Sequence, residues 1–427
     1  MQFSNTTLEL AQTLDAQDEL AHFRDAFVSD DPNLIYLDGN SLGRLPKSTV
    51  GVMQHAIEQD WGRRLIRGWN EGWIQTPLEL GKKIAELIGA EPDEVIVTDS
   101  TSVNLFKLVI AALRAKPDRT KIVSDIFNFP SDLYILQGAI DLLGQKHQLE
   151  LIPSIDSMTI TPEAVKTAID THTALVCLTH VAFKSAFMYD MAAVTRQAHQ
   201  AGALMLWDLS HSVGAVPVNL HEAGADLAIG CTYKYLNGGP GAPAFLYVRR
   251  DLQTELESPM WGWLGAANPF AFNLEYTPAS DIRRFWVGTP PILSLKAIEP
   301  AVNLLLEAGI NRLRAKSIHQ SEYMIFLAEQ WLTPLGFTIG SPKQADQRGS
   351  HVSLRHAEGY RMNRALIEAE APDVTVIPDF REPDNIRFGI APLYNSFTDI
   401  YRAMERLKTI VANRLYERYT SERSGVT

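Results

Sequence analysis

A lysine between two apolar segments is the first residue of this sequence that could do covalent chemistry. Lys234 lies in the stretch 230–241, after the apolar run 225–230 and before a second apolar run at 242–248. Burying an ammonium is costly unless the charge is paired or neutralised. A desolvated lysine loses its proton readily, and the neutral amine can form a Schiff base. A lysine that extends out of a strand end to solvent is the alternative that this segment alone leaves open.

Two hydroxyl residues after a predicted strand could bind a phosphate. Thr101 and Ser102 follow the apolar segment 94–97 and stand at the start of a predicted helix. In open α/β sheets ligands bind beyond the carboxyl ends of the strands, and the free N–H groups of a helix N-terminus attract anions. Taken alone, an ordinary helix-capping cluster is the stronger interpretation of this segment.

An aspartate at the end of a later strand could pair with a cation. Asp208 follows the apolar segment 203–207, so its charge requires a partner such as a protonated ring nitrogen, although it could also cap the next helix. Three further residues follow predicted strands and could contact the same ligand, or could be core and strand-end residues: Phe129, Thr179 and His211.

One cofactor meets these requirements together. Pyridoxal phosphate needs an anion site for its phosphate, a stacking side chain, an anion at its pyridinium nitrogen and a lysine for its aldehyde. Asp208, followed one strand later by Lys234, fits the last two requirements. The sequence contains neither a Walker loop nor a G-x-G-x-x-G motif, so a nucleoside triphosphate or a dinucleotide is not indicated. We predict no metal site.

The elements around these residues predict a layered α/β fold. From residue 94 onward, short apolar segments alternate with segments of helical spacing, which is typical of a mostly parallel sheet flanked by helices. After Pro290-Pro291 the pattern changes to two long helices, 292–315 and 317–332, and then to short strands and a final helix. We predict three parts: an N-terminal segment (1–50) that joins the small domain, a large domain (51–295) and a smaller α+β domain (296–427).

Composition restricts the possible partners. The 427 residues are 46% hydrophobic and carry a net charge of −11 without a basic cluster, which favours a soluble globular protein and argues against nucleic acid binding. We expect a cytoplasmic protein without membrane contact, because no apolar run approaches the roughly 20 residues that cross a bilayer and no secretion signal is evident. Cys177 and Cys231 lie in apolar runs and are expected to be buried, reduced thiols.

Six motifs of the chain follow the order and spacing of a known enzyme family. The two longest are Asp-Leu-Ser-His at 208–211 and Thr-Tyr-Lys-Tyr-Leu-Asn-Gly-Gly-Pro-Gly at 232–241. The others are the segments 36–43, 262–265, 288–292 and 387–389. With these motifs the sequence resembles the kynureninases, in the class V branch of the fold-type I pyridoxal-phosphate enzymes. The match runs from about Leu34 to Tyr394 and covers most of the chain.

The resemblance implies a role for each matching residue. Lys234 forms the Schiff base with the cofactor, Asp208 pairs with its pyridinium, and Tyr233 binds the phosphate and carries a proton, since a phenol near cations could have a lowered pKa. The other implied cofactor-binding residues are Thr101, Ser102, Phe129, Asp132, Thr179, His211, Trp263 and Thr289, the last two from the neighbouring subunit of a homodimer. The implied substrate-binding residues are Arg387, which clamps the α-carboxylate, and Asn40, Ser41, Trp69, Trp73 and Gly288.

The implied activity is hydrolytic cleavage of the β,γ carbon–carbon bond of L-kynurenine, and of its 3-hydroxy form, to anthranilate or 3-hydroxyanthranilate and L-alanine in tryptophan degradation. Gly288, Thr289 and Ala266 resemble the bacterial-type pocket, so we expect plain kynurenine to be preferred. Two alternatives remain: another class V enzyme such as an aminotransferase, and a non-catalytic binding protein that keeps the fold. A cysteine desulfurase needs a mobile cysteine late in the chain, and none follows Cys231.

Overall fold

The alternating apolar segments form one seven-stranded sheet in this computed structural model, which describes residues 3–369 and 372–422. In spatial order its strands are β2 (Val95–Val97), β8 (Phe245–Val248), β7 (Leu227–Gly230), β6 (Leu204–Asp208), β5 (Thr173–Thr179), β3 (Lys121–Asp125) and β4 (Gln148–Ile152). β8 is antiparallel to both of its neighbours, β2 and β7, and the other four pairings of the sheet are parallel. The predicted mostly parallel sheet is therefore confirmed.

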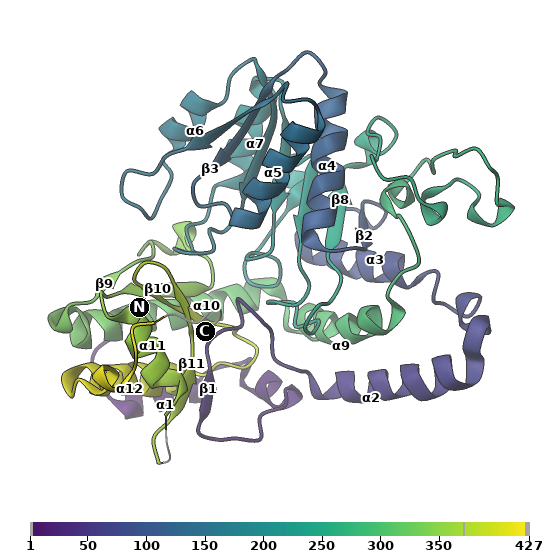
Figure 1. Cartoon of the computed structure of the whole chain (residues 1–427). Coiled ribbons are helices and arrows are strands. Elements are labelled where there is room, and N and C mark those ends of the chain that lie inside the picture. The colour runs from purple at the N-terminus through teal and green to yellow at the C-terminus, as the bar shows by residue number, and fades with distance from the viewer. Residues whose placement is uncertain (1–2, 370–371, 423–427) are drawn as a thin grey trace.

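Helices cover both faces of this sheet, as parallel strands require (Figure 1). The side chains of β6 alternate between two apolar clusters: Met205 and Trp207 join the cluster on one face, and Leu204 and Leu206 join the other. The first cluster includes residues of α3 (Thr76–Ile88), α7 (Met191–Gln200) and α8 (Leu220–Ala223). The second includes residues of α4 (Thr101–Ala115) and α5 (Pro130–Leu142), while α6 (Pro162–Ala168) adds Val165 to the first.

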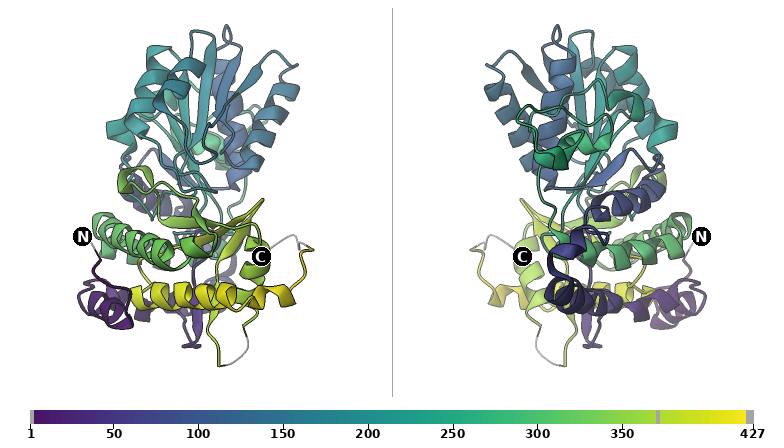
Figure 2. Two further views of the ribbon diagram at one scale, coloured as in Figure 1. Left: turned by 90° about the vertical axis from the view of Figure 1, so that its left-hand side faces the viewer. Right: turned by 90° about the vertical axis from the view of Figure 1, so that its right-hand side faces the viewer.

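A second, smaller body lies below the large sheet (Figure 2). Its four antiparallel strands are, in spatial order, β12 (Asp379–Arg381), β13 (Asn385–Gly389), β10 (His351–Arg355) and β9 (Thr338–Ile339). Its helices are α10 (Ile310–Trp331), α11 (Gly359–Ile367) and α12 (Phe397–Ala412). The N-terminal segment contacts this body, because β1 (Leu34–Tyr36) pairs with β11 (Thr375–Ile377) and α1 (Leu8–Ala16) packs on α12. The predicted domain boundaries themselves stay a prediction.

The two long helices predicted after Pro291 divide earlier than expected. α9 (Ile292–Ala308) ends at Gly309, which has φ 78°, and α10 begins at the next residue. A left-handed φ at this position favours glycine, so the break falls here and not at Lys316. α9 packs against α3 and α2 (Lys47–His55), and its buried residues join the core of the large sheet.

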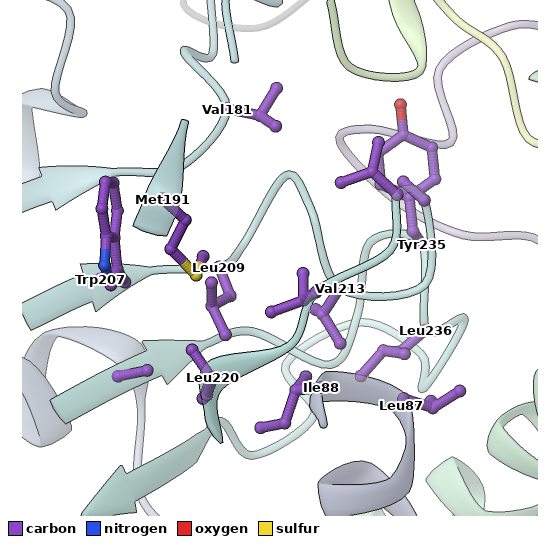
Figure 3. Packing of buried hydrophobic residues seen from close by; sticks show 14 of the residues in the cluster. Leu87, Ile88, Val181, Met191, Trp207, Leu209, Val213, Leu220, Tyr235 and Leu236 are labelled. Carbon is purple, nitrogen blue, oxygen red and sulfur yellow. The ribbon is translucent and has the colours of Figure 1, made fainter. Parts of the chain in front are cut away.

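One apolar cluster fixes the turns that carry the two central site residues. Trp207 and Leu209 flank Asp208, and Tyr235 follows Lys234; all three of these neighbours are buried in the same cluster (Figure 3). Core packing holds side chains in defined positions. The flanking residues therefore fix where Asp208 and Lys234 stand relative to each other.

Candidate active site

The carboxyl ends of β5 and β6 bring the predicted ring-binding residues together. Thr179 and Asp208, the last residues of these strands, are direct partners in the parallel register. A cavity of about 230 Å³ beside them is also lined by Phe129, Asp132 and His211. These five residues come from three segments of the chain, and the structure places all of them around one cavity.

Lys234 enters the same cavity from the turn that follows β7. Its Nζ lies 3.0 Å from His211 Nε2 and 5.8 Å from the centroid of the Phe129 ring. Burial, and after it the charge of Lys234, holds the pKa of His211 well below its ordinary value, so the imidazole is neutral. A neutral His211 can accept a hydrogen bond from the Lys234 ammonium through Nε2.

Two buried carboxyl groups, those of Asp208 and Asp132, line this cavity. Burial raises the pKa of Asp208, against the hydrogen bonds that Ser210 donates to Oδ1 from its N–H (2.9 Å) and its hydroxyl (2.6 Å). Burial and then the charge of Asp208 raise the pKa of Asp132 well above its ordinary range. Asp132 Oδ2 is buried and has no hydrogen-bond partner among the described residues. A ligand that brings a proton or a positive charge would satisfy both groups.

A second cavity of about 590 Å³ adjoins the first and shares Thr101, Ser102 and Tyr233 with it. Thr101 and Ser102 form the first turn of α4, which Ser100 caps by accepting the Val103 N–H at 3.3 Å. The free N–H groups and positive dipole end of this 15-residue helix favour an anion at this place. The predicted phosphate-binding segment therefore lies where a group bound to Lys234 could present a phosphate.

Gly288 and Thr289 line this second cavity from the same chain. The resemblance implies instead that Thr289 of a neighbouring subunit approaches the phosphate. That expectation concerns two chains, so it stays a prediction.

Arg387 reaches the first cavity from β13 of the small body. Its side chain is 2% exposed, and it forms an ion pair with Asp379, its direct partner in the antiparallel register of β12 and β13. Asn40 and Ser41, from the N-terminal segment, line the same cavity, and Ser41 Oγ accepts a hydrogen bond from Arg387 at 2.9 Å. Predicted substrate-binding residues from two distant segments thus line the cavity that Lys234 also lines.

Three predicted tryptophans lie away from both cavities. Trp69 and Trp73 pack edge to face against each other, with ring centroids 5.5 Å apart, in the connection between α2 and α3. Trp263 packs against Phe270 at 5.7 Å. Among the described residues of this single chain, none of the three tryptophans is part of the lining of either cavity. Their ring-binding and phosphate-binding roles remain predictions.

The expected lowering of the Tyr233 pKa is wrong. Burial is the first cause that raises this pKa above its ordinary value, and the neighbouring Cys231 and Asp208 raise it further. Tyr233 lines both cavities as a protonated phenol that can donate a hydrogen bond. The cationic cluster around Lys234 does not outweigh desolvation at this hydroxyl.

Several residues that line the first cavity were not predicted from the sequence, and they are Ser131, Phe183, Ser210 and Arg381. Ser131 lies in the first turn of α5, and its hydroxyl lies 3.1 Å from that of Ser102, so its position after a predicted strand could have identified it. Arg381 lies on β12, a strand of three residues that has no apolar pattern to predict it.

The residues present fit pyridoxal phosphate. The unpaired buried oxygen of Asp132 and the raised pKa of Asp208 call for a protonated polar ring, and the start of α4 suits a phosphate. Lys234 has an amine within the same cavity. Among the described residues no cluster of three or more His, Cys, Asp or Glu side chains could hold a metal ion.

The fold has known counterparts among solved structures. A cysteine desulfurase from Thermococcus onnurineus NA1 aligns with a TM-score of 0.77 at 19% identity over 89% of this chain and 95% of that one. The cysteine desulfurase CsdA from Escherichia coli aligns with a TM-score of 0.77 at 16% identity over 94% of this chain and 99% of that one. The chain thus has the fold of the cysteine desulfurases, and at this identity the likeness concerns the fold alone.

Sequence relatives define the family more narrowly. A family model described as the kynureninase C-terminal domain matches residues 313–407. A kynureninase from Pseudomonas fluorescens is 45% identical over 416 residues, which are 96% of this chain and 97% of that protein. A kynureninase from Burkholderia mallei is 43% identical over 410 residues, 95% of each chain. This chain belongs to the kynureninase family.

No helix in the described ranges 3–369 and 372–422 is both long and apolar enough to cross a membrane. Both cysteines, Cys177 and Cys231, are buried and free, as expected.

Proposed function

We propose that this chain is a pyridoxal-phosphate-dependent hydrolase that cleaves the β,γ carbon–carbon bond of L-kynurenine to give anthranilate and L-alanine. The observation that carries the proposal is the meeting of Lys234, Asp208 and Arg387 around one cavity, in a chain 45% identical over nearly its full length to a kynureninase. An amine, an anion for a pyridinium and a guanidinium for an α-carboxylate are the groups that an amino acid substrate of this cofactor requires.

The chain's own residues would hold the cofactor in a defined orientation. Thr101 and Ser102 would bind the phosphate, Asp208 would pair with the ring nitrogen, and Phe129 would stack on the ring, since all four residues line one cavity. Bound there, the cofactor supplies an electron sink that stabilises negative charge developing on the substrate. Because Asp208 is buried, its interaction with a protonated ring nitrogen is not weakened by solvent.

Lys234 is the base that is positioned to move protons. Its Nζ can take the proton from the substrate Cα once the amine is free. His211 Nε2, 3.0 Å away and unprotonated, then accepts a hydrogen bond from Nζ and keeps the amine oriented toward the cavity. Tyr233, whose pKa is raised, acts as a hydrogen-bond donor.

The same proposal includes a homodimer in the cytoplasm that acts in tryptophan degradation and prefers plain kynurenine to its 3-hydroxy form. Large apolar side chains of the segment after α2 are exposed, among them Trp61 and Ile66, the latter at 76%. Contiguous exposed apolar surface is typical of a protein interface.

The test is to incubate cofactor-loaded protein with L-kynurenine and to measure anthranilate and alanine together. Equimolar appearance of both products is the expected result. If kynurenine is consumed and no alanine forms, the reaction is transamination and the proposed cleavage is wrong. If kynurenine does not react while the cofactor stays bound, the chain acts on a different substrate, as another class V enzyme does.

A further inference from the structure

The guanidinium of Arg387 is already committed to neighbours within the chain. Nε donates to Asp379 Oδ1 at 2.9 Å, and Nη2 donates to Asp379 Oδ2 and, at 2.9 Å, to Ser41 Oγ. Nη1 donates to the carbonyl of Phe183, and the amide oxygen of Asn40 faces the Nε–Nη2 edge. A guanidinium has five N–H donors, so only one of them, on Nη1, is left for a ligand. Arg387 alone therefore offers no fork for a carboxylate.

The charge of Arg387 is also compensated. Asp379 is buried beside it, with a side chain that is 1% exposed. A buried ion pair has no net charge with which to attract an anion. A substrate carboxylate in this cavity needs a further cation.

Arg381 supplies that cation and has donors to spare. It stands two residues after Asp379 on β12, on the same face of the strand, and its Nη2 donates to Asp379 Oδ2 at 2.8 Å. Its Nε is buried and has no hydrogen-bond partner among the residues that the structure describes. Arg381 lines the cavity that also contains Lys234 and Arg387. Its side chain is 38% exposed, so a ligand entering the cavity can reach it.

The two arginines and Asp379 together carry one net positive charge, which matches one carboxylate. Asp38 lies in the same cluster, and burial followed by the charge of Asp379 raises the pKa of Asp38 to about 7. Asp38 therefore contributes less than a full negative charge at neutral pH. Among the other groups that face the cluster, His211 and His351 are neutral, since burial holds the pKa of each well below its ordinary value.

We propose that Arg381 is the second carboxylate-binding residue of the site: it supplies the net positive charge and the free N–H groups that hold an amino acid α-carboxylate beside Arg387, while Asp379 positions both guanidinium groups. The inference rests on the proposed function, because that function brings an α-amino acid into the cavity. It deepens that function by assigning the charge that binds the substrate to a residue outside the predicted set.

The test compares Arg381→Gln with the unaltered holoenzyme, with L-alanine as the probe ligand. The dissociation constant of L-alanine is measured from the change in cofactor absorbance, and KM and kcat are measured with L-kynurenine. Loss of a hydrogen bond to a charged group predicts an increase of about tenfold or more in the dissociation constant and in KM. We expect kcat to change less than threefold, and Arg381→Lys to recover part of the loss.

Two controls make the outcome specific. The first control is Arg355→Gln, because Arg355 on β10 pairs with Asp384 and does not line the cavity. L-alanine binding should be unchanged in this variant. The decarboxylated amine of kynurenine should bind the Arg381→Gln variant as well as it binds the unaltered protein. An unchanged dissociation constant for L-alanine, or equal weakening for the decarboxylated amine, would overturn the proposal. If the unaltered holoenzyme binds L-alanine but does not cleave kynurenine, the proposed reaction fails and the carboxylate site is still tested.

Discussion

Replacement of Lys107 by Met tests how the phosphate-sized cavity is held in shape. Lys107 has no exposed side-chain surface, and its Nζ donates to Asp99 Oδ2 and to the Phe285 carbonyl, both at 2.7 Å. Asp99 lines the cavity with a φ of 51°, and the chain beyond Phe285 lines it as a second wall at residues 287–291. Lys107 therefore links the two walls through one buried ammonium.

The structure sets the size of the expected effect. Removing one partner of a buried ion pair costs about 3–5 kcal/mol. Asp99 keeps 27% of its side chain exposed, so water recovers part of that loss and we expect about 2–3 kcal/mol. An unfolding entropy of about 2.1 cal/mol/K per residue gives ~0.9 kcal/mol/K for 427 residues, so Tm should fall by about 2–3 °C.

The assay is thermal unfolding of the cofactor-free protein, followed by titration with pyridoxal phosphate. An unpaired Asp99 carboxylate repels a phosphate, so the dissociation constant should rise about tenfold in Lys107→Met. The double variant Lys107→Met/Asp99→Asn should regain most of both losses, because neither charge is then left unpaired.

Lys82→Met is the matched control, since Lys82 pairs with Glu79 on an exposed helix face and should contribute less than about 0.5 kcal/mol. A Lys107→Met protein as stable as the original would refute the reasoning. A double variant no better than the single one would assign the loss to the Phe285 carbonyl and not to Asp99.

Three further predictions concern the site and its surface. Lys234→Ala should abolish anthranilate release and the absorbance of lysine-bound cofactor; full activity in this variant would contradict the central assignment. The pKa of Asp38 is raised from 3.8 to about 7, so between these pH values the folded state holds a proton that the unfolded chain releases. The stability of the protein therefore falls as the pH rises from about 4 to 7. Asp38→Asn lacks this proton, so its Tm should fall less between pH 5 and 7 than the Tm of the unaltered protein. Ile66→Asp, at a residue 76% exposed, should shift a dimer toward monomer in sedimentation velocity, whereas an unaltered sedimentation coefficient would exclude this surface from the interface.

The large sheet could be predicted because its strands are short apolar runs with regular helices between them. The same rule that places ligands beyond the carboxyl ends of strands selected Thr179 and Asp208, which prove to be register partners. Lys234 was selected because an amine between apolar segments is unusual, and the structure places it in the same cavity. Local sequence pattern and general sheet topology were therefore sufficient to predict that Thr179, Asp208 and Lys234 lie close together.

The small body was harder to predict because its elements are short and polar. β12 consists of Asp379, Phe380 and Arg381, and no alternation can be recognised over three residues. The break at Gly309 could have been predicted, because glycine commonly follows a helix end. Trp69 and Trp73 pack edge to face against each other, and the substrate-facing role that the resemblance implies for them stays a prediction.

β12, which the sequence pattern did not predict, also explains why the carboxylate site could not be derived from the motif at 387–389 alone. A bidentate clamp was expected of Arg387 because its planar fork suits a carboxylate. The structure shows that Asp379 occupies this fork with two acceptor oxygens, that Ser41 of the N-terminal segment takes a third donor, and that Phe183 of the large domain takes a fourth. Arg387 thus joins three parts of the chain and keeps one free donor, whereas Arg381 has several donors to spare. Cofactor binding, which depends on the large sheet, should therefore be separable by mutation from carboxylate binding, which depends on contacts between the two bodies.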